Sequence, residues 1–439
     1  MTFDRNTRPL QKLLLGYLGI AILGGFLLLL PFTHAAEASA TDYWFTAISA
    51  LSTTGLTTIN TAEHYNFAGE LITLILFQIG GVGYMSLVGF VVYSVGHRHR
   101  QADDSDDMLM KDLQPPEGMS LRQFVLLVLK FTLIAELIGA VLLSYAFWQQ
   151  GESEYIWKGI FISVSAFCTA GLDLFENSLT EYSDNYLVNW VVIILTMAGA
   201  LGFLFLTNLV EVVKGKTQLC LSSKIIIAVV AASLALGIFG TAVAGSPVIE
   251  IETTPYWMAV IFQSVSIITT SGFATVSMEG FVPVNIVLII LLMFVGASPS
   301  GTGGGAKSTT VAAVLAGLKA FVRGHSQVTV FGKAIPYHRV EYAMSALALR
   351  ILLVIVGALG LQYLQPLDSV DVWFEVTSAI ATVGLSKGIT GDLSTASKWL
   401  IIAVMFAGRV GPLSIMIALL RSRKDDTADT EQEDVAVES

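Results

Sequence analysis

The sequence predicts an all-α polytopic membrane protein, in which four repeats of helix, pore loop and helix surround one pseudo-fourfold axis. Two observations predict this fold. Charged residues make up 13% of the 439 residues and hydrophobic residues 54%, whereas about a quarter of the residues of a soluble protein are charged. In addition, a segment that starts with Phe and ends in a Thr-x-Gly turn occurs four times, at residues 45–56, 161–172, 262–273 and 374–385. Such an internal repeat predicts four equivalent structural units.

The four copies place the same residue types at the same distances from their last glycine. Phe stands ten residues before that glycine, Ser six and Thr two, and a bulky apolar residue follows it. The turns read Thr53, Thr54, Gly55, Leu56; Thr169, Ala170, Gly171, Leu172; Thr270, Ser271, Gly272, Phe273; and Thr382, Val383, Gly384, Leu385. The agreement of four copies in register argues against a chance loop between membrane helices.

The length of the segment indicates a helix that enters the membrane without crossing it. Ten apolar or small residues form about three helical turns, roughly 15 Å, which is half of a bilayer's hydrocarbon core. Glycine permits a positive φ, and non-helical backbone at membrane depth is tolerated only where it is buried in protein or lines a polar cavity. Four such turns around one axis would present rings of carbonyl oxygens, as a potassium filter does. We therefore expect K⁺ to bind at the residues of these turns.

Apolar segments on both sides of each of the four re-entrant pore helices predict eight spanning helices. The outer helices are expected at residues 13–30, 124–148, 225–243 and 342–363, and the inner helices at 67–95, 186–213, 282–322 and 396–420. The chain then divides into four repeats, a cytoplasmic linker and an acidic cytoplasmic tail: residues 1–96, 97–121, 122–214, 215–323, 324–424 and 425–439. The small residues at 35–40 imitate a signal-peptidase site, but cleavage there would remove the first outer helix, so we expect none.

The lysines and arginines of the loops indicate how these helices cross the membrane. Most of them fall on one side, which the positive-inside rule makes the cytoplasm, and Lys158, Lys387 and Lys398 fall on the other. Both termini are therefore expected in the cytoplasm, and the four turns are expected to open outward. Acidic residues near this opening would together raise the local cation concentration, although each one by itself fits an ordinary solvated loop residue: Glu63, Asp173, Glu176, Glu181, Asp184 and Glu279.

A polar, glycine-rich stretch interrupts the third inner helix. It comprises Gly296, Ala297, Ser298, Pro299, Ser300, Gly301, Thr302, Gly303, Gly304, Gly305, Ala306, Lys307, Ser308 and Thr309. One proline and five glycines are incompatible with a continuous helix. The stretch partly matches a phosphate-binding P-loop, but Ala306 stands in place of the last glycine and no strand is expected before it. A loop that lines a cavity fits the composition better.

Arg409 is expected to lie at the same depth as this loop. Gly296 and Arg409 both fall about 13 or 14 residues into their inner helices, roughly 20 Å deep at 1.5 Å per residue. A lone arginine inside the membrane faces a polar interior, and the freed carbonyls of the loop are its expected partners. The loop and Arg409 are therefore the candidate gate, whereas Lys130 and Arg350 are expected to snorkel from the cytoplasmic ends of outer helices.

The four Thr-x-Gly turns, residues 296–310 and the run Gly-Arg-Val-Gly-Pro at 408–412 together resemble the signatures of the Trk/Ktr/HKT superfamily of potassium transporters. The chain most resembles the Ktr membrane subunit (KtrB-like). The resemblance implies potassium uptake across the plasma (inner) membrane by a homodimer with one pore per protomer, with Na⁺ as an activator. It also implies a cytoplasmic ring of an RCK-type nucleotide-binding regulatory subunit (KtrA-like) and no organic cofactor in this chain. Backbone potassium ligands at the four turn glycines, a gate in the glycine-rich loop and a gating role for Arg409 are implied in the same way.

Two other classes of function remain open on the sequence. One is a carrier-type cation symporter with a binding site near the midplane of the membrane. The other is a membrane-embedded hydrolase, which would need a nucleophile and a base at the same depth, whereas the six histidines lie in loops or at helix ends. We therefore expect no enzymatic activity and no transition-metal site. The net charge of −10 gives no support for binding nucleic acid.

Overall fold

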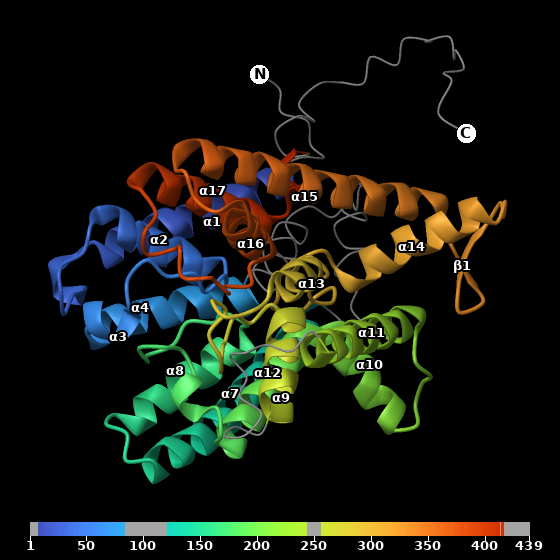
Figure 1. Ribbon diagram of the computed structural model, residues 1–439. Coiled ribbons are helices and arrows are strands. Elements are labelled where there is room, and N and C mark those ends of the chain that lie inside the picture. Colours follow the sequence, from blue (N-terminus) through green and yellow to red (C-terminus); the bar gives the residue numbers. More distant parts are fainter. Residues whose placement is uncertain (1–7, 84–120, 244–255, 413, 417–439) are drawn as a thin grey trace.

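The computed structural model describes residues 8–83, 121–243, 256–412 and 414–416, and these are mostly helical (Figure 1). Four long helices are α1 (Arg8–Leu28), α7 (Leu121–Gln149), α11 (Leu221–Val243) and α15 (Tyr337–Leu364). Within the described ranges, α7, α11 and α15 are each long and apolar enough to cross a membrane, and the bent pair α9–α10 counts as a further span if its two helices are taken together. With a mean hydropathy of +0.71 for the chain, these helices belong to a membrane protein.

Four shorter helices contain the repeated segment. They are α2 (Ala40–Leu51), α8 (Tyr155–Phe167), α12 (Tyr256–Thr269) and α16 (Ser369–Ala381). At 1.5 Å per residue these are roughly 18–21 Å long, too short to cross a bilayer. The repeated Phe near the middle of each helix is at most 2% exposed. Burial of this ring at four equivalent places fixes each helix against its neighbours by the hydrophobic effect.

The other helices of the four repeats include two pairs that are interrupted, α9–α10 and α13–α14. These other helices are α4 (Phe67–Gln78), which a π-helical turn (Ile79–Gly83) continues; the pair α9 (Tyr186–Leu201) and α10 (Phe203–Val213); the pair α13 (Pro283–Phe294) and α14 (Ser308–Val322); and α17 (Thr395–Val410). Among the described helices, contacts run in a closed order from α2 through α4, α8, α9, α12, α13 and α16 to α17 and back to α2. The long helices α1, α7, α11 and α15 pack on α2, α8, α12 and α16, respectively.

The second inner helix was expected to be continuous over residues 186–213, and this expectation was wrong. The segment bends by 99° between α9 and α10, at Gly202, whose φ is +84° and ψ 151°. This backbone conformation is essentially restricted to glycine. A Cβ at Gly202 would also fall within 3.0 Å of the carbonyl oxygen of Pro299 and of the amide nitrogen of Gly301. The bend therefore exists where another segment of the chain occupies the space beside the helix.

The glycine-rich loop supplies the hydrogen bonds that this bend removes from the helix. The amides of Ser298 and Thr302 donate to the carbonyls of Ala200 and Gly199, at 3.0 and 3.1 Å. Ser300 accepts in the other direction. Its carbonyl accepts from the amide of Phe203 at 3.4 Å and its Oγ from the amide of Leu204 at 3.1 Å. Backbone groups inside a membrane must be paired within the protein, so the loop and the bend stabilise each other.

Other departures from the expected boundaries are smaller. The first helix begins at Arg8, five residues earlier than expected. An antiparallel hairpin of β1 (Val328–Val330) and β2 (Lys333–Ile335) follows α14 and lies at the far end of α14 and α15 (Figure 1). Short turns of helix occur at Pro31–Thr33, Thr61–His64 (α3) and Thr180–Tyr182. The expected linker up to residue 120, the first inner helix beyond residue 83 and the acidic tail lie outside the described residues.

Replacing Gly202 by Ala should lower the melting temperature of the detergent-solubilised protein. The new Cβ would need a disfavoured backbone conformation and would collide with the carbonyl of Pro299, and such strain costs about 1–3 kcal/mol. Gly215→Ala is the matched control, because Gly215 has a φ of +70° but no atom within 4 Å of the added Cβ. Equal losses in the two variants would contradict the role given to the contact between the loop and the bend.

Candidate functional site

Each of the four short helices ends in the same hydrogen-bonded turn. The residue before the last glycine donates its N–H to the carbonyl of the repeated serine, at 2.8 Å from Thr54 to Ser49, 2.8 Å from Ala170 to Ser165, 3.0 Å from Ser271 to Ser266 and 2.9 Å from Val383 to Ser378. This is the six-to-one bond of a Schellman motif. The repeated threonine takes the left-handed position, with φ between 48 and 56° in all four copies. A β-branched residue is an outlier there, so each turn holds strained backbone.

The four turns lie against one another in a closed cycle. Each last glycine has a positive φ, between 66 and 90°. A Cβ added to any of them would fall within 3.0 Å of the carbonyl before the next glycine: Gly55 against Ala170, Gly171 against Ser271, Gly272 against Val383, and Gly384 against Thr54. The fourth turn thus closes on the first. We call residues 53–56, 169–172, 270–273 and 382–385 the turn ring, and only glycine fits its points of contact.

The repeated serine was identified in the sequence but was given no role there. In three of the four copies its hydroxyl forms a hydrogen bond to the turn that follows the helix. The Oγ atoms of Ser165 and Ser266 donate to the carbonyls of Leu172 and Phe273, both at 2.7 Å. The Oγ of Ser378 instead accepts from the amide of Gly384 at 3.1 Å. The Oγ of Ser49 is buried and has no hydrogen-bond partner in the described part of the chain. The first turn therefore lacks this serine contact and has instead a hydrogen bond between the hydroxyls of Ser52 and Thr54, at 2.6 Å.

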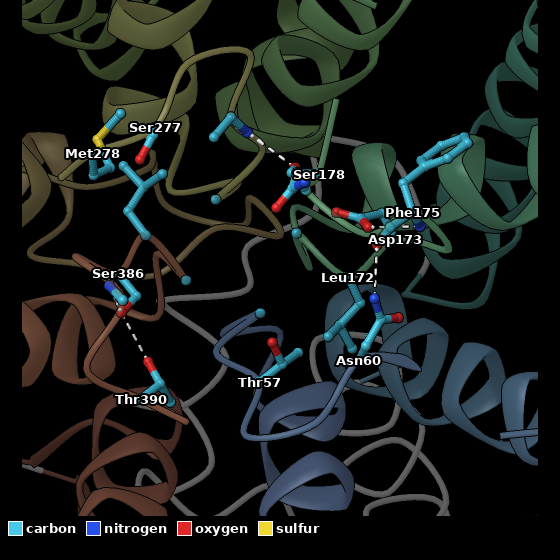
Figure 2. Close-up of a pocket in the computed structure, with 18 of the residues that line it drawn as sticks. Thr57, Asn60, Leu172, Asp173, Phe175, Ser178, Ser277, Met278, Ser386 and Thr390 are labelled. Atoms are coloured by element: carbon cyan, nitrogen blue, oxygen red, sulfur yellow. Dashed lines mark hydrogen bonds between the residues drawn. The ribbon is translucent and has the colours of Figure 1, made fainter. Parts of the chain in front are cut away.

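A cavity of about 430 Å³ opens on the glycine side of the turn ring. All four ring glycines line it, together with polar side chains of the following loops, including Thr57, Ser386 and Thr390 (Figure 2). Asp173 also lines it, and its carboxylate accepts a hydrogen bond from the amide of Phe175 at 3.1 Å. Burial raises the pKa of Asp173 to about 6, because a low-dielectric environment disfavours the charged form. The carboxylate is charged above that pH, which favours cations at the mouth of the ring.

The three lysines expected on the outer side are each paired with a carboxylate. Lys158 contacts Glu152 at 2.5 Å, and Lys398 contacts Asp42 at 2.7 Å. Lys387 is paired with Asp371. An opposite charge at such a distance cancels most of the field of a lysine at long range. These lysines therefore do not oppose the approach of a cation to the cavity.

The glycine-rich loop contacts the threonine side of the same ring. The Oγ1 of Thr302 lies 3.3 Å from that of Thr169 and donates to the carbonyl of Phe167 at 3.0 Å. The amide of Gly304 donates to the Oγ1 of Thr270 at 2.9 Å. A Cβ on Gly304 would also fall within 3.0 Å of the Oγ1 of Thr382. The loop thus touches the threonines of three of the four turns and lies directly beneath the ring.

Arg409, in α17, joins this loop to the first inner helix. Its Nη1 donates to the carbonyl of Thr302 at 2.5 Å, and its Nη2 donates to the carbonyl of Gly80. The expected contact between Arg409 and a carbonyl of the loop is therefore present. Lys307 donates to the carbonyl of Gly303 at 2.8 Å, within the loop itself. Charge-assisted hydrogen bonds of this kind are stronger than neutral ones, so they hold the loop in place.

The expectation for Arg350 was wrong. This residue is the fourteenth of the 28 residues of α15, in the middle of the helix and not near its end. It lines a second cavity, of about 320 Å³, which lies between the loop, α15 and α17 and is also lined by Lys307 and Arg409. The amphipathic pattern of α15 could not reveal this, because the cavity wall is made by the loop, which is distant in the sequence.

Three glycines of the inner helices were given no packing role from the sequence, although Gly408 belongs to the Gly-Arg-Val-Gly-Pro run. A Cβ on Gly80, Gly199 or Gly408 would fall within 3.0 Å of a carbonyl near the end of a short helix, that of Leu51, Phe167 or Ile380, respectively. These carbonyls stand four residues before the ring glycines. A signal existed, because the three glycines follow the ring glycines of their own repeats after 25, 28 and 24 residues. They let each inner helix approach the turn ring closely.

A family model described as "TrkH: Cation transport protein" matches residues 23–427. The chain belongs to the TrkH family of cation transport proteins. This TrkH-family chain is 32% identical to the potassium/sodium uptake protein NtpJ of Enterococcus hirae, over 95% of this chain and 94% of that protein. It is also 32% identical to the Ktr system potassium uptake protein B of Vibrio alginolyticus, over 93% of this chain and 90% of that protein. The resemblance to the Trk/Ktr superfamily found in the motifs is confirmed.

The fold of this TrkH-family chain is similar to a solved structure. The crystal structure of the potassium transporter TrkH from Vibrio parahaemolyticus matches it with a TM-score of 0.71 and 21% identity, over 92% of this chain and 83% of that one. The mostly helical membrane fold expected from the sequence is therefore confirmed. These relatives are transport proteins, which is consistent with the expectation that the chain is not an enzyme.

Replacing Ser165 by Ala should lower the free energy of unfolding by about 1 kcal/mol, the usual contribution of one hydrogen bond. Ser49→Ala should have almost no effect, because the hydroxyl of Ser49 has no partner within the described residues. Both serines occupy the same place in the repeat and both are buried, so the comparison isolates the hydrogen bond. Denaturation of the two purified variants in one detergent measures the difference, and equal stabilities would contradict the assigned contact.

Proposed function

We propose that the chain takes up potassium through a channel-like pore whose selectivity filter is the turn ring. The observation that carries this proposal is the closed cycle of contacts from Gly55 through Gly171 and Gly272 to Gly384 and back. Four backbone turns around one axis can surround a single ion with carbonyl oxygens, and carbonyl oxygens replace the hydration shell of K⁺. The names of the relatives NtpJ and Ktr system protein B, which include potassium uptake, support the choice of ion.

The fold that this function needs has eight spanning helices and four re-entrant pore helices around the pore. The closed order of contacts among the described helices supports a pseudo-fourfold arrangement of four helix–pore loop–helix repeats. In it, each short helix ends at the ring. The C-terminal end of a helix carries a partial negative charge, and four such ends favour a cation at the centre. The left-handed threonines end the helical hydrogen bonding at the turns. Because the carbonyls of Leu172 and Phe273 accept from serine side chains, the proposed ligands are the other carbonyls of the turns.

The gate in this proposal is the loop Gly296–Thr309 together with Arg409. The loop touches the threonines of three turns. Arg409, in α17, anchors it at the carbonyl of Thr302 and also donates to the carbonyl of Gly80, which follows α4. A hydrated ion that leaves the ring would meet the backbone of the loop. The guanidinium adds a fixed positive charge in a low-dielectric region, where a charge acts more strongly than in water. Both features oppose the passage of a cation until the loop moves.

Membership of the family also suggests an oligomeric state and a regulatory subunit for the chain. We propose a homodimer in the plasma membrane with both termini in the cytoplasm, a cytoplasmic RCK-type regulatory ring, and Na⁺ as an activator. The names "Ktr system" and "potassium/sodium uptake protein" of the relatives support a system of several components and a link to sodium. The residues of the positive-inside pattern support the orientation.

A carrier-type cation symporter is the second candidate. The breaks in α9–α10 and α13–α14 favour it, because discontinuous helices near the midplane form the binding sites of many carriers. The two candidates differ in how flux depends on the ion gradient. Uptake by reconstituted protein that saturates at low ion concentration indicates a carrier, whereas flux that follows the electrochemical driving force indicates a channel-like pore.

Replacing Gly55 by Ser should admit sodium. The added Cβ would displace the carbonyl of Ala170 and distort the proposed filter. The measurement is uptake of rubidium and sodium tracers by the purified protein in vesicles. Gly391→Ser is the matched control, because Gly391 lines the outer cavity but has no atom within 4 Å of an added Cβ. Unchanged discrimination between the two ions in a well-folded Gly55→Ser protein would refute the filter assignment for that turn.

Deleting much of residues 300–306, or replacing Arg409 by Ala, should raise flux and keep the preference for potassium. We expect an increase of roughly tenfold or more, because each 1.4 kcal/mol removed from a barrier is about tenfold in rate. The double change should be non-additive, because the two features share one hydrogen-bond network. Arg323→Ala, which removes an exposed arginine at the end of α14, is the control. Unchanged or lower flux in both single variants would reduce the loop to a passive kink.

A further inference from the structure

Three basic side chains line the second cavity. Lys307, Arg350 and Arg409 all line it, and none of its other lining residues, all within the described ranges, is acidic. Lys307 and Arg409 also make hydrogen bonds to backbone carbonyls of the loop. Three cations around one partly enclosed space repel one another, and the repulsion grows as the local dielectric falls. An anion between them would lower this repulsion.

The guanidinium of Arg350 has an unsatisfied hydrogen-bond donor within the part of the chain that the structure describes. Its Nη1 is buried and has no hydrogen-bond partner among the described residues. A buried donor left without a partner costs free energy, and more so when it is charged. Arg350 lies in the middle of α15 and lines the second cavity. A partner for this donor would therefore lie in the cavity. A guanidinium binds a carboxylate or a phosphate with two parallel hydrogen bonds.

The remaining wall of the cavity suits an anion with several oxygens. Thr309 and Thr310, in the first turn of the 15-residue helix α14, line it, and the N-terminus of a helix favours negative charge. The hydroxyls of Ser300 and Ser414 are further donors on the wall. A volume of about 320 Å³ is ample for a tetrahedral oxyanion. Lysine, two arginines, hydroxyls and a helix N-terminus together are the usual recognition elements of a phosphate group.

We propose that this cavity is a binding site for a phosphate group, with Arg350 as its principal ligand and Lys307 and Arg409 as supporting cations. The phosphate comes either from the headgroup of an anionic lipid or from free inorganic phosphate, and the chemistry of recognition is the same. A further consequence rests on the proposed gate: a bound anion cancels part of the positive field below the turn ring. Occupancy of the site therefore favours passage of cations.

Binding is tested without transport, so that it can fail or succeed independently of the gate. Equilibrium dialysis of the full chain in an uncharged detergent against radiolabelled inorganic phosphate measures the first source. Native mass spectrometry after incubation with phosphatidylglycerol or phosphatidylcholine measures the second. Arg350→Gln should weaken binding of the phosphate-bearing probe by roughly tenfold or more, as expected for loss of hydrogen bonds to a charged group. Arg339→Gln, which removes an exposed arginine from the same helix, should leave binding unchanged.

Further variants show whether a loss of binding comes from misfolding, from another occupant of the cavity or from loss of the site. Arg350→Lys keeps the charge and should bind more weakly than wild type but more tightly than Arg350→Gln, while equal melting temperatures show that the variants fold. Equal binding of either probe by wild type and Arg350→Gln, or no preference for phosphatidylglycerol together with no bound phosphate, overturns the proposal. Phosphate binding that occurs only after removal of residues 425–439 also overturns it, because the acidic tail would then be the occupant.

The effect on transport is measured last, in phosphatidylcholine vesicles with and without the probe that binds. Potassium uptake should rise severalfold with the probe in wild type and not in Arg350→Gln. If binding depends on Arg350 but uptake does not respond, the site stands and its link to the gate is refuted. If the loop deletion and Arg409→Ala also leave uptake unchanged, the proposed gate itself is wrong, and the binding result is unaffected.

Discussion

The structure depends on the close approach of four backbone turns at the ends of four short helices. Each turn brings a glycine so near to the carbonyl of the next turn that a single added carbon would not fit. This approach requires a short helix that ends at the turn, a left-handed threonine to end it, and surrounding helices that pack around the turn. The buried phenylalanines and the glycines of the inner helices serve the same requirement, because both let helices pack tightly around the turns.

The second organising feature is the exchange of hydrogen bonds between the loop after α13 and the bend between α9 and α10. Neither segment can satisfy its own backbone inside a membrane, and together they do so. The loop is also held by the threonines of the turn ring and by Arg409. The interruption between α13 and α14 and the bend between α9 and α10 are therefore coupled, because each satisfies the backbone groups of the other. A proline and glycines alone would explain the first break but not its partner.

The sequence was a good guide wherever the signal is local or repeated. Four copies of one pattern predicted the short helices, and a lone arginine among apolar residues predicted the contact with loop carbonyls, since such a charge has few alternatives inside a membrane. The bend at Gly202 and the position of Arg350 were missed because both depend on a loop about a hundred and about fifty residues away, respectively. The hairpin after α14 is short and polar, and gave no periodic signal. The roles of the turn ring in ion binding and of the loop in gating stay predictions.

The loop also sets what must accompany any displacement of it. When it leaves the bend, the carbonyls of Gly199 and Ala200 and the amides of Phe203 and Leu204 lose their partners. Groups of this kind are too costly to leave bare in an apolar layer, so solvent has to take over their hydrogen bonds. Displacement of the loop would therefore require water to enter between the loop and the bend. Such an equilibrium would depend on the activity of water, and a solute too large to enter the cavity would shift it toward the arrangement in which the loop is packed on the bend.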